Sequence, residues 1–442
     1  MSYVGQWTTR SQVIGAVFAL AVLSACSGDG GSDAELALRT EIDSLGDTLV
    51  VRTIGSADAG ARELVEEVRV GEMEGAEEYT FGAIAEILAL PDGSVLLFDR
   101  LVPALRHYGS DGKLIRTIGR KGGGPGEYEA AGGLALLPDG RVAMWDPRNG
   151  RIQLYSLDGT PGEMERLPSG FHSNRSLWAD DAGNLYYRAV IRDTSTASSR
   201  QAPTLRTGAA RFALGTSRHD TMPPPVEALP SQMLTVSSPN GSSFATRNVP
   251  FTSNRTWTVF EGGFAFTTDD RYRIVVERNG ETMVIERDIQ PVAVQSAERR
   301  NHEEVATFNM RDVNPGWSWN GPAIPDRKAF VKSLVPAPDG RLWVHTSAPG
   351  VVDSTLINEE RTEDEGPALI WTEPLTTDIF ASDGRFEGRI VFPERTRSWL
   401  YSAYGDHVWG VQADEWGVEQ LVRWRITPGP GDHSATASRA SN

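Results

Sequence analysis

Apolar and polar positions alternate in short runs between Ala83 and Thr160, and the same arrangement occurs there twice. In each copy, Ile87–Gly119 and Leu134–Gly162, an apolar run meets a Pro-Asp-Gly turn and then a second apolar run that ends in aspartate. A third apolar run and a second Asp-Gly turn follow. Asp-Gly between apolar runs is a hairpin signal, because glycine supplies the positive φ that a tight turn needs. Three short strands in about 35 residues, written twice, predict stacked β units, and a β-propeller is the natural solution.

A common register extends this pattern along the chain when the turn glycine is taken as its origin. The turn position is held by Gly93, Gly140, Gly183, Gly263 and Gly340, with Asp406 in the equivalent place last. The residues two and three positions after each turn are apolar or aromatic. Adjacent apolar residues indicate a strand covered on both faces, as in a blade between two neighbours. The pattern therefore predicts an all-β chain folded as a six-bladed β-propeller.

Longer spacings between the later turns require insertions. Ile191–Asn254 is rich in Ser, Thr and Pro, and is expected to hold outer strands of the third blade at Ala209–Leu214. The same range then supplies a long loop, and the inner strand of the next blade precedes Gly263. Gln290–Met310 lacks glycine and predicts one short helical insertion that starts after Pro291.

Ring closure needs a strand that joins the first blade to the last. Thr48–Ile54 is β-branched and strand-like, and it has no partner nearby in the sequence. The last candidate blade ends with Gln420–Ile426, close to the chain terminus. We therefore predict that Thr48–Ile54 completes that blade and closes the propeller as one cooperative ring. Ala61–Val70 is interpreted as a short helix or an irregular entry segment.

Composition narrows the classes of partner. The net charge of −16 disfavours nucleic acids and anionic lipid surfaces, because both are bound through basic surfaces. The single cysteine, Cys26, excludes an internal disulfide. It follows the apolar run Val13–Leu23, which has the length of a signal-peptide core and is too short to span a bilayer comfortably.

The four residues Leu23–Cys26, Leu-Ser-Ala-Cys, resemble the lipobox of bacterial lipoproteins. In that family the cysteine is acylated and becomes the mature N-terminus, and a serine after it, here Ser27, favours the outer membrane. The alternative is an ordinary secretory signal peptide cut after Ala25. The sequence then divides into a signal peptide with lipobox, a flexible tether, a six-bladed β-propeller and a disordered tail, at residues 1–26, 27–47, 48–427 and 428–442.

Two blades also resemble NHL repeats. Asn149–Gly159 carries the Asn, Arg-Ile-Gln and Asp-Gly of that repeat, and Thr117–Tyr128 is similar to the Gly-Pro-Gly-aromatic link between NHL-like blades. Later segments look like blades of bacterial six-bladed β-propeller lipoproteins. The resemblance covers Phe81–Asp158 and Pro325–Ile426 and is poor across Arg188–Asn320. It implies the fold and leaves the function open, because propellers host many activities.

Two motifs offer candidate ligand-binding residues. The glycine-rich run before Pro125 lacks the Lys-Ser/Thr of a phosphate-binding loop, which favours a crossing between blades with Arg120 or Lys121 on a rim. Trp317 and Trp319 lie beside prolines in an irregular insertion. If exposed, they could stack on sugars or grip a peptide; otherwise they cover the seam between blades four and five.

Motifs for catalysis are missing. No Gly-x-Ser-x-Gly occurs, and Asn301–Ala306 lacks the second histidine of a helical zinc site. The resemblance implies that propeller enzymes such as lactonases are relatives. These enzymes hold Ca²⁺ in the central channel through oxygen ligands. Asp99 and Asp146 share one register position, yet the NHL pattern also places such an aspartate for local hydrogen bonding. We assign no catalytic residue, metal or cofactor, and keep calcium as an alternative.

The expected function is binding. We expect a monomer, anchored through Cys26 in the bacterial envelope and facing the periplasm, that binds a protein, peptide or glycan and no nucleic acid. One alternative is a channel-centred enzyme, either a calcium-dependent lactonase-like hydrolase or an NHL-type lyase. Another is a purely structural envelope subunit. Oxygen ligands converging on the channel would favour the enzyme, and exposed Trp317 and Trp319 would favour a binding rim.

Overall fold

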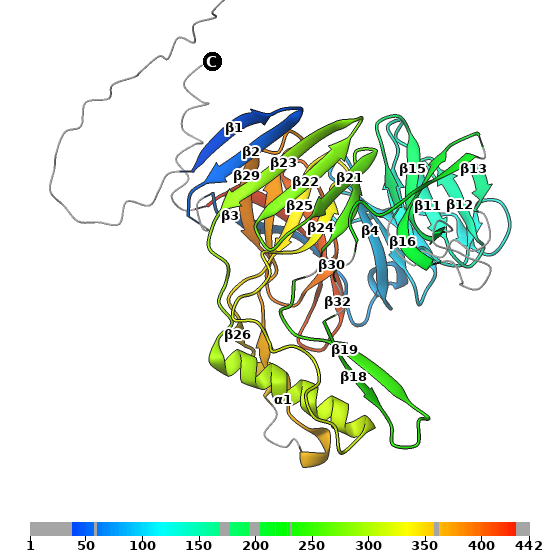
Figure 1. Cartoon of the computed structure of the whole chain (residues 1–442). Coiled ribbons are helices and arrows are strands. Elements are labelled where there is room, and N and C mark those ends of the chain that lie inside the picture. The colour runs from blue at the N-terminus through cyan, green and yellow to red at the C-terminus, as the bar shows by residue number, and fades with distance from the viewer. Residues whose placement is uncertain are drawn as a thin grey trace, which may run out of the picture. The chain divides into compact units, whose positions relative to one another are not determined.

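The computed structural model describes residues 38–429 except 57–59, 168–176, 194–203, 217, 228, 230–231, 254 and 358–361. Six mostly antiparallel sheets form the blades of a β-propeller, which confirms the predicted fold (Figure 1). Within the described residues, α1 (Ser296–Val313) is the α-helix, and it confirms the predicted helical insertion. Single turns of 3₁₀ helix occur at η1 (Glu77–Tyr79), η2 (Ser354–Leu356) and η3 (Glu363–Glu365).

The first three blades each use four strands that are consecutive in the chain. Blade 1 contains β4 (Ile84–Ala89), β5 (Val95–Asp99), β6 (Ala104–Tyr108) and β7 (Leu114–Ile118). Blade 2 contains β10 (Gly133–Leu136), β11 (Val142–Asp146), β12 (Arg151–Tyr155) and β13 (Pro161–Arg166). Blade 3 contains β14 (Leu177–Ala179), β15 (Asn184–Asp193), β16 (Thr204–Ala213) and β17 (Arg218–Met222). The strand β16 confirms the outer strand predicted at Ala209–Leu214.

The last three blades take up insertions and N-terminal strands. Blade 4 contains β20 (Trp257–Phe260), β21 (Gly263–Thr267), β22 (Arg273–Arg278) and β23 (Glu281–Asp288), then β2 (Thr48–Ile54) and β1 (Arg39–Leu45). Blade 5 contains β24 (Val331–Pro336), β25 (Leu342–Thr346), β28 (Thr376–Phe380) and β29 (Phe386–Val391). Blade 6 contains β30 (Thr396–Tyr404), β31 (His407–Ala413), β32 (Glu419–Pro428) and β3 (Arg62–Val70). Three pairs of short strands lie outside the blades: β8 (Arg120–Lys121) with β9 (Glu127–Tyr128), β18 (Met233–Ser237) with β19 (Phe244–Asn248), and β26 (Val351–Val352) with β27 (Trp371–Thr372).

The Asp-Gly turns form as predicted and set the strand register. In the first turn the Asp92 carboxylate accepts the Ser94 N–H at 3.0 Å, and Gly93 has φ 81°. This aspartate fixes its own backbone two residues on, and glycine takes the left-handed conformation at no steric cost. The turn glycines of blades 2, 3 and 5 have φ between 78° and 83°, as their predicted turn positions require.

The predicted turn position of the fourth blade is wrong by one residue. The turn there has only two residues, Glu261 and Gly262, with φ 46° and 81°, and Gly263 already pairs with Phe260 in the ladder. Because side chains alternate along a strand, this single-residue slip exchanges the two faces of β21. Ala265 consequently packs toward blade 5, although the predicted register matched it to residues that face the preceding blade.

A separate hydrophobic core fills each of the six seams between blades. The residue two positions after a turn faces the preceding blade, and the residue three positions after it faces the following blade. Val95 of blade 1, for example, shares a cluster with Trp409 of blade 6, whereas Leu96 shares one with Met144 of blade 2. Both faces of a blade are therefore buried, which explains why apolar residues are adjacent in the sequence.

The predicted closure by an N-terminal strand is correct, but the predicted segment is wrong. Ring closure uses β3, which pairs antiparallel with β32 as the outermost strand of blade 6. Thr48–Ile54 instead lies in blade 4, where β2 runs parallel to β23 and carries β1 on its outer side. The β1 strand falls within the range assigned above to the tether.

The interpretation of Ala61–Val70 as a short helix or an irregular segment is wrong, and a β-bulge in β3 explains why. The register of β3 against β32 shifts between Glu66 and Val68, so Glu67 has no partner in the ladder. Leu64 faces the seam with blade 5, and after the bulge Val68 and Val70 face the seam with blade 1. The extra residue breaks the alternation of a strand and leaves apolar spacings that resemble those of a helix.

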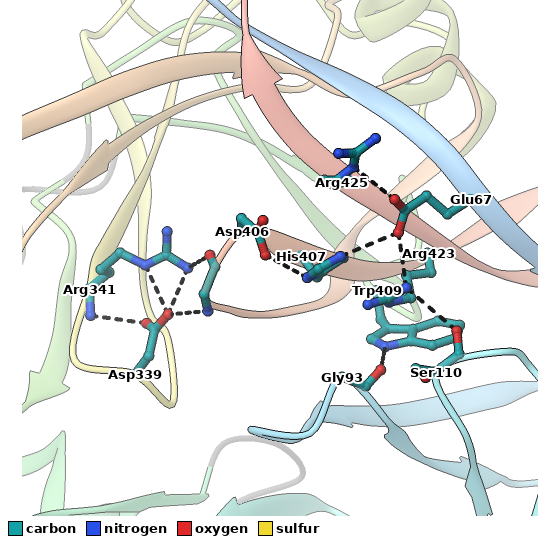
Figure 2. Close-up of polar contacts among 11 residues, drawn as sticks. Glu67, Gly93, Ser110, Asp339, Arg341, Asp406, His407, Trp409, Arg423 and Arg425 are labelled. Atoms are coloured by element: carbon teal, nitrogen blue, oxygen red, sulfur yellow. Dashed lines mark hydrogen bonds and ion pairs between the residues drawn. The ribbon is translucent and has the colours of Figure 1, made fainter. Parts of the chain in front are cut away.

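The bulge places Glu67 beside three basic side chains of β31 and β32, and these contacts connect the closing strand β3 to the rest of blade 6 (Figure 2). Its carboxylate lies 2.9 Å from Arg423 Nη1, 2.8 Å from Arg425 Nε and 3.3 Å from His407 Nε2. Asp406 contacts the other ring nitrogen of His407 at 2.6 Å. Because the Glu67 side chain is 25% exposed, these contacts orient the closing strand more than they stabilise it.

Candidate functional site

The two faces of the propeller differ in their connections. One face carries the turns between the first and second and between the third and fourth strands of each blade, and most of these are tight Asp-Gly turns. The other face carries the connections between blades and between the second and third strands. Three long insertions, 223–256, 289–330 and 347–375, all belong to these connections, so they emerge on the same face. We call them together the insertion module.

The insertion module has a hydrophobic core of its own. The β18–β19 hairpin packs Leu234 and Val236 against Ala306 and Met310 of α1, and Trp317 closes the cluster. The helix begins later than the predicted position after Pro291, because a capping box between Gln295 and Glu298 fixes its N-terminus. Figure 1 shows α1, the β18–β19 hairpin and β26 gathered on one side of the blades.

A buried ion cluster joins the insertion module to blade 5. Lys328 is fully buried, and its Nζ lies 2.5 Å from Glu298 Oε1 at the start of α1 and 3.3 Å from Glu373 Oε1. The same ammonium donates to the Ala348 carbonyl at 3.0 Å and lies 4.9 Å from the centre of the Phe251 ring. These partners come from all three insertions, so one side chain connects the whole module.

The charges in this cluster are balanced within the protein. Burial raises the pKa of Glu373, but Lys332 at 2.8 Å, the Ala348 N–H and Lys328 together outweigh burial and leave the pKa below its ordinary value. Burial lowers the pKa of His302 on α1, against the opposing effect of Glu298. The lowered pKa values leave Glu373 ionised and the His302 imidazole neutral at pH 7. We call this cluster of Lys328, Glu298, Glu373 and Lys332 the ionic joint.

Hydrogen bonds from α1 hold the third insertion in place. The Asn301 amide donates to the Ala368 carbonyl at 2.9 Å and accepts the Ile370 N–H at 3.0 Å. Gln295 donates to the Gly350 carbonyl at 2.9 Å. The three insertions are therefore one structural unit, fixed to a rigid scaffold.

The two candidate tryptophans belong to this module. Trp317 is 7% exposed in the module core, and its Nε1 donates to the Thr235 carbonyl at 2.9 Å. Trp319 is half-buried beside it, with ring centres 6.3 Å apart, and donates to the Pro322 carbonyl. The Trp317 ring therefore has no open face for stacking, and ligand binding by Trp319 stays a prediction. Neither ring covers the seam between blades four and five, because that seam has a separate cluster.

The other candidates, Arg120 and Lys121, form the exposed strand β8 in the crossing from blade 1 to blade 2. Arg120 is paired with Glu127 at 2.7 Å. Arg151 fills the glycine-rich loop from below, donating to the Gly123 and Gly124 carbonyls at 2.9 and 2.8 Å. The loop thus presents carbonyl oxygens to a guanidinium, as suits a crossing between blades. Ligand binding at this rim stays a prediction.

The aspartates that share one register position make local hydrogen bonds. The Asp99 carboxylate accepts the backbone N–H groups of Gly82 and Ala83 at 2.7 and 3.1 Å, and that of Leu101 at 2.9 Å. Asp146 plays the same part in blade 2. No three His, Cys, Asp or Glu side chains of the described residues group closely enough to hold a metal ion. Cys26, the predicted lipidation site, lies outside the described residues.

A serine–histidine pair lies in the seam between blades 5 and 6, and another, Ser94 with His107, lies in blade 1. Ser333 Oγ is 2.7 Å from His345 Nδ1, and His345 Nε2 is 2.7 Å from the Tyr401 hydroxyl. Burial, with a smaller contribution from Lys332, lowers the pKa of His345 to about 4. A nucleophile–base pair needs a third group that stabilises the imidazolium, and an uncharged phenol of raised pKa does not do so. We therefore interpret His345 as a structural residue. Both of its ring nitrogens have hydrogen-bond partners, and these bonds connect β24 and β25 to β30.

Comparisons with known proteins find only distant structural neighbours. No family model and no curated protein matches the chain. A putative exported protein from Bacteroides fragilis is 12% identical, with TM-score 0.42, covering 86% of this chain and 99% of that one. A DUF4221 family member from Bacteroides vulgatus is 9% identical, with TM-score 0.45, covering 83% and 98%. A gluconolactonase from Xanthomonas campestris is 10% identical, with TM-score 0.37, covering 78% and 88%.

The buried ion cluster of the module was not found from the sequence, although its helix and its two tryptophans were. Lys328 and Glu298 lie in polar stretches, where a lysine or glutamate is ordinarily solvated. The available signal was the capping-box spacing of Gln295 and Glu298, which marks a helix start but says nothing about burial. In the described part of the chain, no helix is both long and apolar enough to cross a membrane.

Proposed function

We propose that this protein is a lipid-anchored envelope β-propeller that binds a protein or peptide partner through its insertion module. The observation that carries the proposal is the convergence of three insertions on one face. They come from separate parts of the chain, share a core and are joined by the buried Lys328. Binding residues are commonly found on loops that a rigid scaffold positions, and this face is the elaborated one.

Energetic cost supports a role beyond stability. A buried ion pair such as Lys328 and Glu298 stabilises a fold no better than apolar side chains of similar volume. The core of the module is a cluster separate from the cores of the six seams, to which the insertions add only a few partly buried residues near their ends, Val226, Ile289, Phe330 and Leu375. A purely structural subunit would have no need of such a module. Its fixed, folded surface suits recognition of a macromolecule.

The anchor is the second part of the proposal. The lipobox-like Leu23–Cys26 supports acylation of Cys26. Cys26→Ser should move the full-length protein from the membrane fraction into the soluble periplasmic fraction. Continued sedimentation with membranes after a high-salt wash would contradict lipid anchoring.

The binding face can be tested with a photo-crosslinking residue placed in the intact protein in its own cells. Glu303 on α1 is exposed, and Asp111 and Asp383 are exposed in tight turns of the opposite face. We expect an envelope protein to be captured from position 303 and not from positions 111 or 383. Capture from the turn positions alone, or equal capture from all three, would contradict the assignment of the module as the binding site.

A further inference from the structure

The β18–β19 hairpin of the insertion module has two edges whose backbone groups can be assigned. The Ser238 N–H donates to the Ser243 carbonyl, and the Val249 N–H donates to the Gln232 carbonyl, both at 2.9 Å. In an antiparallel pair, hydrogen-bonded and non-hydrogen-bonded positions alternate. The N–H and C=O groups of alternate residues on each strand therefore point away from the hairpin. These residues are Met233, Thr235 and Ser237 on β18, and Phe244, Thr246 and Asn248 on β19.

The outer edge of β18 is covered by side chains from the segment after α1. The Thr235 N–H donates to Asn320 Oδ1 at 3.2 Å, and the Thr235 carbonyl accepts from Asn320 Nδ2 at 2.7 Å and Trp317 Nε1 at 2.9 Å. Asn314 donates to the Ser237 carbonyl at 3.0 Å. These three side chains satisfy the edge much as a neighbouring strand would.

The outer edge of β19 has no such cover. Among the described residues, β19 pairs with β18 alone, and no side chain bonds to the backbone of Phe244, Thr246 or Asn248. The Phe244 side chain is 67% exposed, and Thr246 and Asn248 are exposed beside it. A free strand edge is a ready template for another extended chain.

The β1–β2 hairpin of blade 4, whose outer strand is also exposed, is built differently. The strand β1 carries the alternating charges Arg39, Glu41 and Asp43, which are features that keep an edge from pairing. Five-residue β19 has a single charge, Arg247, and an exposed aromatic ring. Charges thus protect the edge of β1 and side-chain hydrogen bonds cover the edge of β18, whereas among the described residues nothing covers the edge of β19 on the module.

We propose that the β19 edge binds an extended segment of a partner polypeptide as a third strand of the β18–β19 sheet. This inference rests on the proposed function and names the chemistry of its partner. The outward N–H and C=O groups of β19 would bond the peptide backbone, and Phe244 would contact an apolar side chain opposite it. The chain's net charge of −16 disfavours an acidic segment and favours a neutral or basic one.

The direct test uses a fluorescent peptide of alternating threonine and valine, with one central phenylalanine and a lysine at each end. Its control carries N-methyl groups on alternate residues, so one edge can no longer donate. We expect the full-length protein to bind the first peptide and to bind the methylated one at least tenfold more weakly. Equal binding of the two peptides, or no binding of either at millimolar concentration, would overturn the proposal.

Thr246→Pro removes an outward N–H from β19 and adds a ring at the docking edge, while the bonds to β18 remain. The matched variant is Thr40→Pro, because the two-residue turn of the β1–β2 hairpin makes the N–H of Thr40 point outward as well. Peptide affinity should fall at least tenfold in Thr246→Pro and be unchanged in Thr40→Pro. Phe244→Lys, which keeps the backbone intact, should weaken binding at least threefold. Unchanged affinity in both β19 variants would overturn the proposal.

Two outcomes separate this inference from the proposed function. If Thr246→Pro still captures its envelope partner from position 303 as the unmodified chain does, the module binds a partner but the β19 edge is not its docking strand. If sedimentation shows a concentration-dependent dimer that Thr246→Pro abolishes, the occupant is a second copy of this chain. Either result would overturn the partner-peptide assignment and leave the proposed function standing. Loss of capture in Thr246→Pro, with capture retained in Thr40→Pro, would support both.

Discussion

Removing the ammonium at the centre of the insertion module tests whether the module is held by the ionic joint. In Lys328→Met the side chain keeps nearly its length and volume, so little cavity forms. The carboxylate of Glu298, 1% exposed, then loses its cation at 2.5 Å and keeps the Gln295 N–H at 3.3 Å. Glu373 still has Lys332 at 2.8 Å. The largest loss therefore falls on Glu298, while the Ala348 carbonyl loses one donor and Glu373 keeps one of its two cations.

The expected cost follows from leaving one buried charge without its partner. Removing one member of a buried pair costs about 3–5 kcal/mol, because the remaining charge is left without compensation. The double variant Lys328→Met/Glu298→Met removes both charges and should regain all but about 1 kcal/mol. The double variant is thus expected to be about 2–4 kcal/mol more stable than Lys328→Met.

Urea unfolding of the full chain gives the free energies, and hydrogen exchange at the α1 amides locates the loss. Exchange in α1 should speed up in Lys328→Met, while the amides of β5 and β11 stay protected. The hydrophobic core that these two strands share contains no residue of the module. A cost below about 1 kcal/mol for the single variant, or equal loss of protection in α1 and the blades, would refute the reasoning.

Three further predictions concern the propeller itself. Burial lowers the pKa of His345 from 6.5 to about 4, so between these pH values the folded chain binds fewer protons than the unfolded chain. The contribution of His345 to stability is therefore complete above about pH 6.5 and falls by about 3 kcal/mol toward pH 4. In urea titrations, His345→Gln should reduce the slope of the free energy of unfolding against pH. Gly112→Ala should cost at least about 2 kcal/mol, since φ is 78° and a Cβ would lie 2.6 Å from Val68, whereas Gly140→Ala, with open space at φ 83°, should cost about 1 kcal/mol by thermal unfolding. Glu67→Gln should cost about 1 kcal/mol and speed hydrogen exchange in β3; unchanged exchange there would contradict its role at the bulge.

The blades could be predicted because their signal is local and repeated. Each Asp-Gly turn fixes its own geometry through the aspartate side chain, as Asp92 does for Ser94, so the turn is legible without its surroundings. The two residues after it face opposite seams, and both must be apolar. The predicted turn position in the fourth blade is wrong because the turn there is different: Glu261 and Gly262 make a shorter turn without aspartate.

Closure and the candidate site depend on contacts between distant residues, which no local pattern records. The strand β3 meets β32 across more than 350 positions of the chain, and its bulge at Glu67 hides the alternation that would have marked a strand. Lys328 becomes buried only because three separate insertions meet around it. The openness of the β19 edge likewise depends on where Asn314, Trp317 and Asn320 reach, since they cover the other edge.

The insertions lie on one face for a physical reason that the turns supply. The turn at Gly112 packs against Val68 and Val70 of β3, the outermost strand of the preceding blade, and the turn at Gly384 packs against Met283 and Ile285 of β23. An added loop at either turn would have to displace these side chains from a seam. At these two turns added chain would meet a packed seam, whereas the three long insertions all leave from the opposite face. Partner recognition is therefore expected on the face that carries the insertion module.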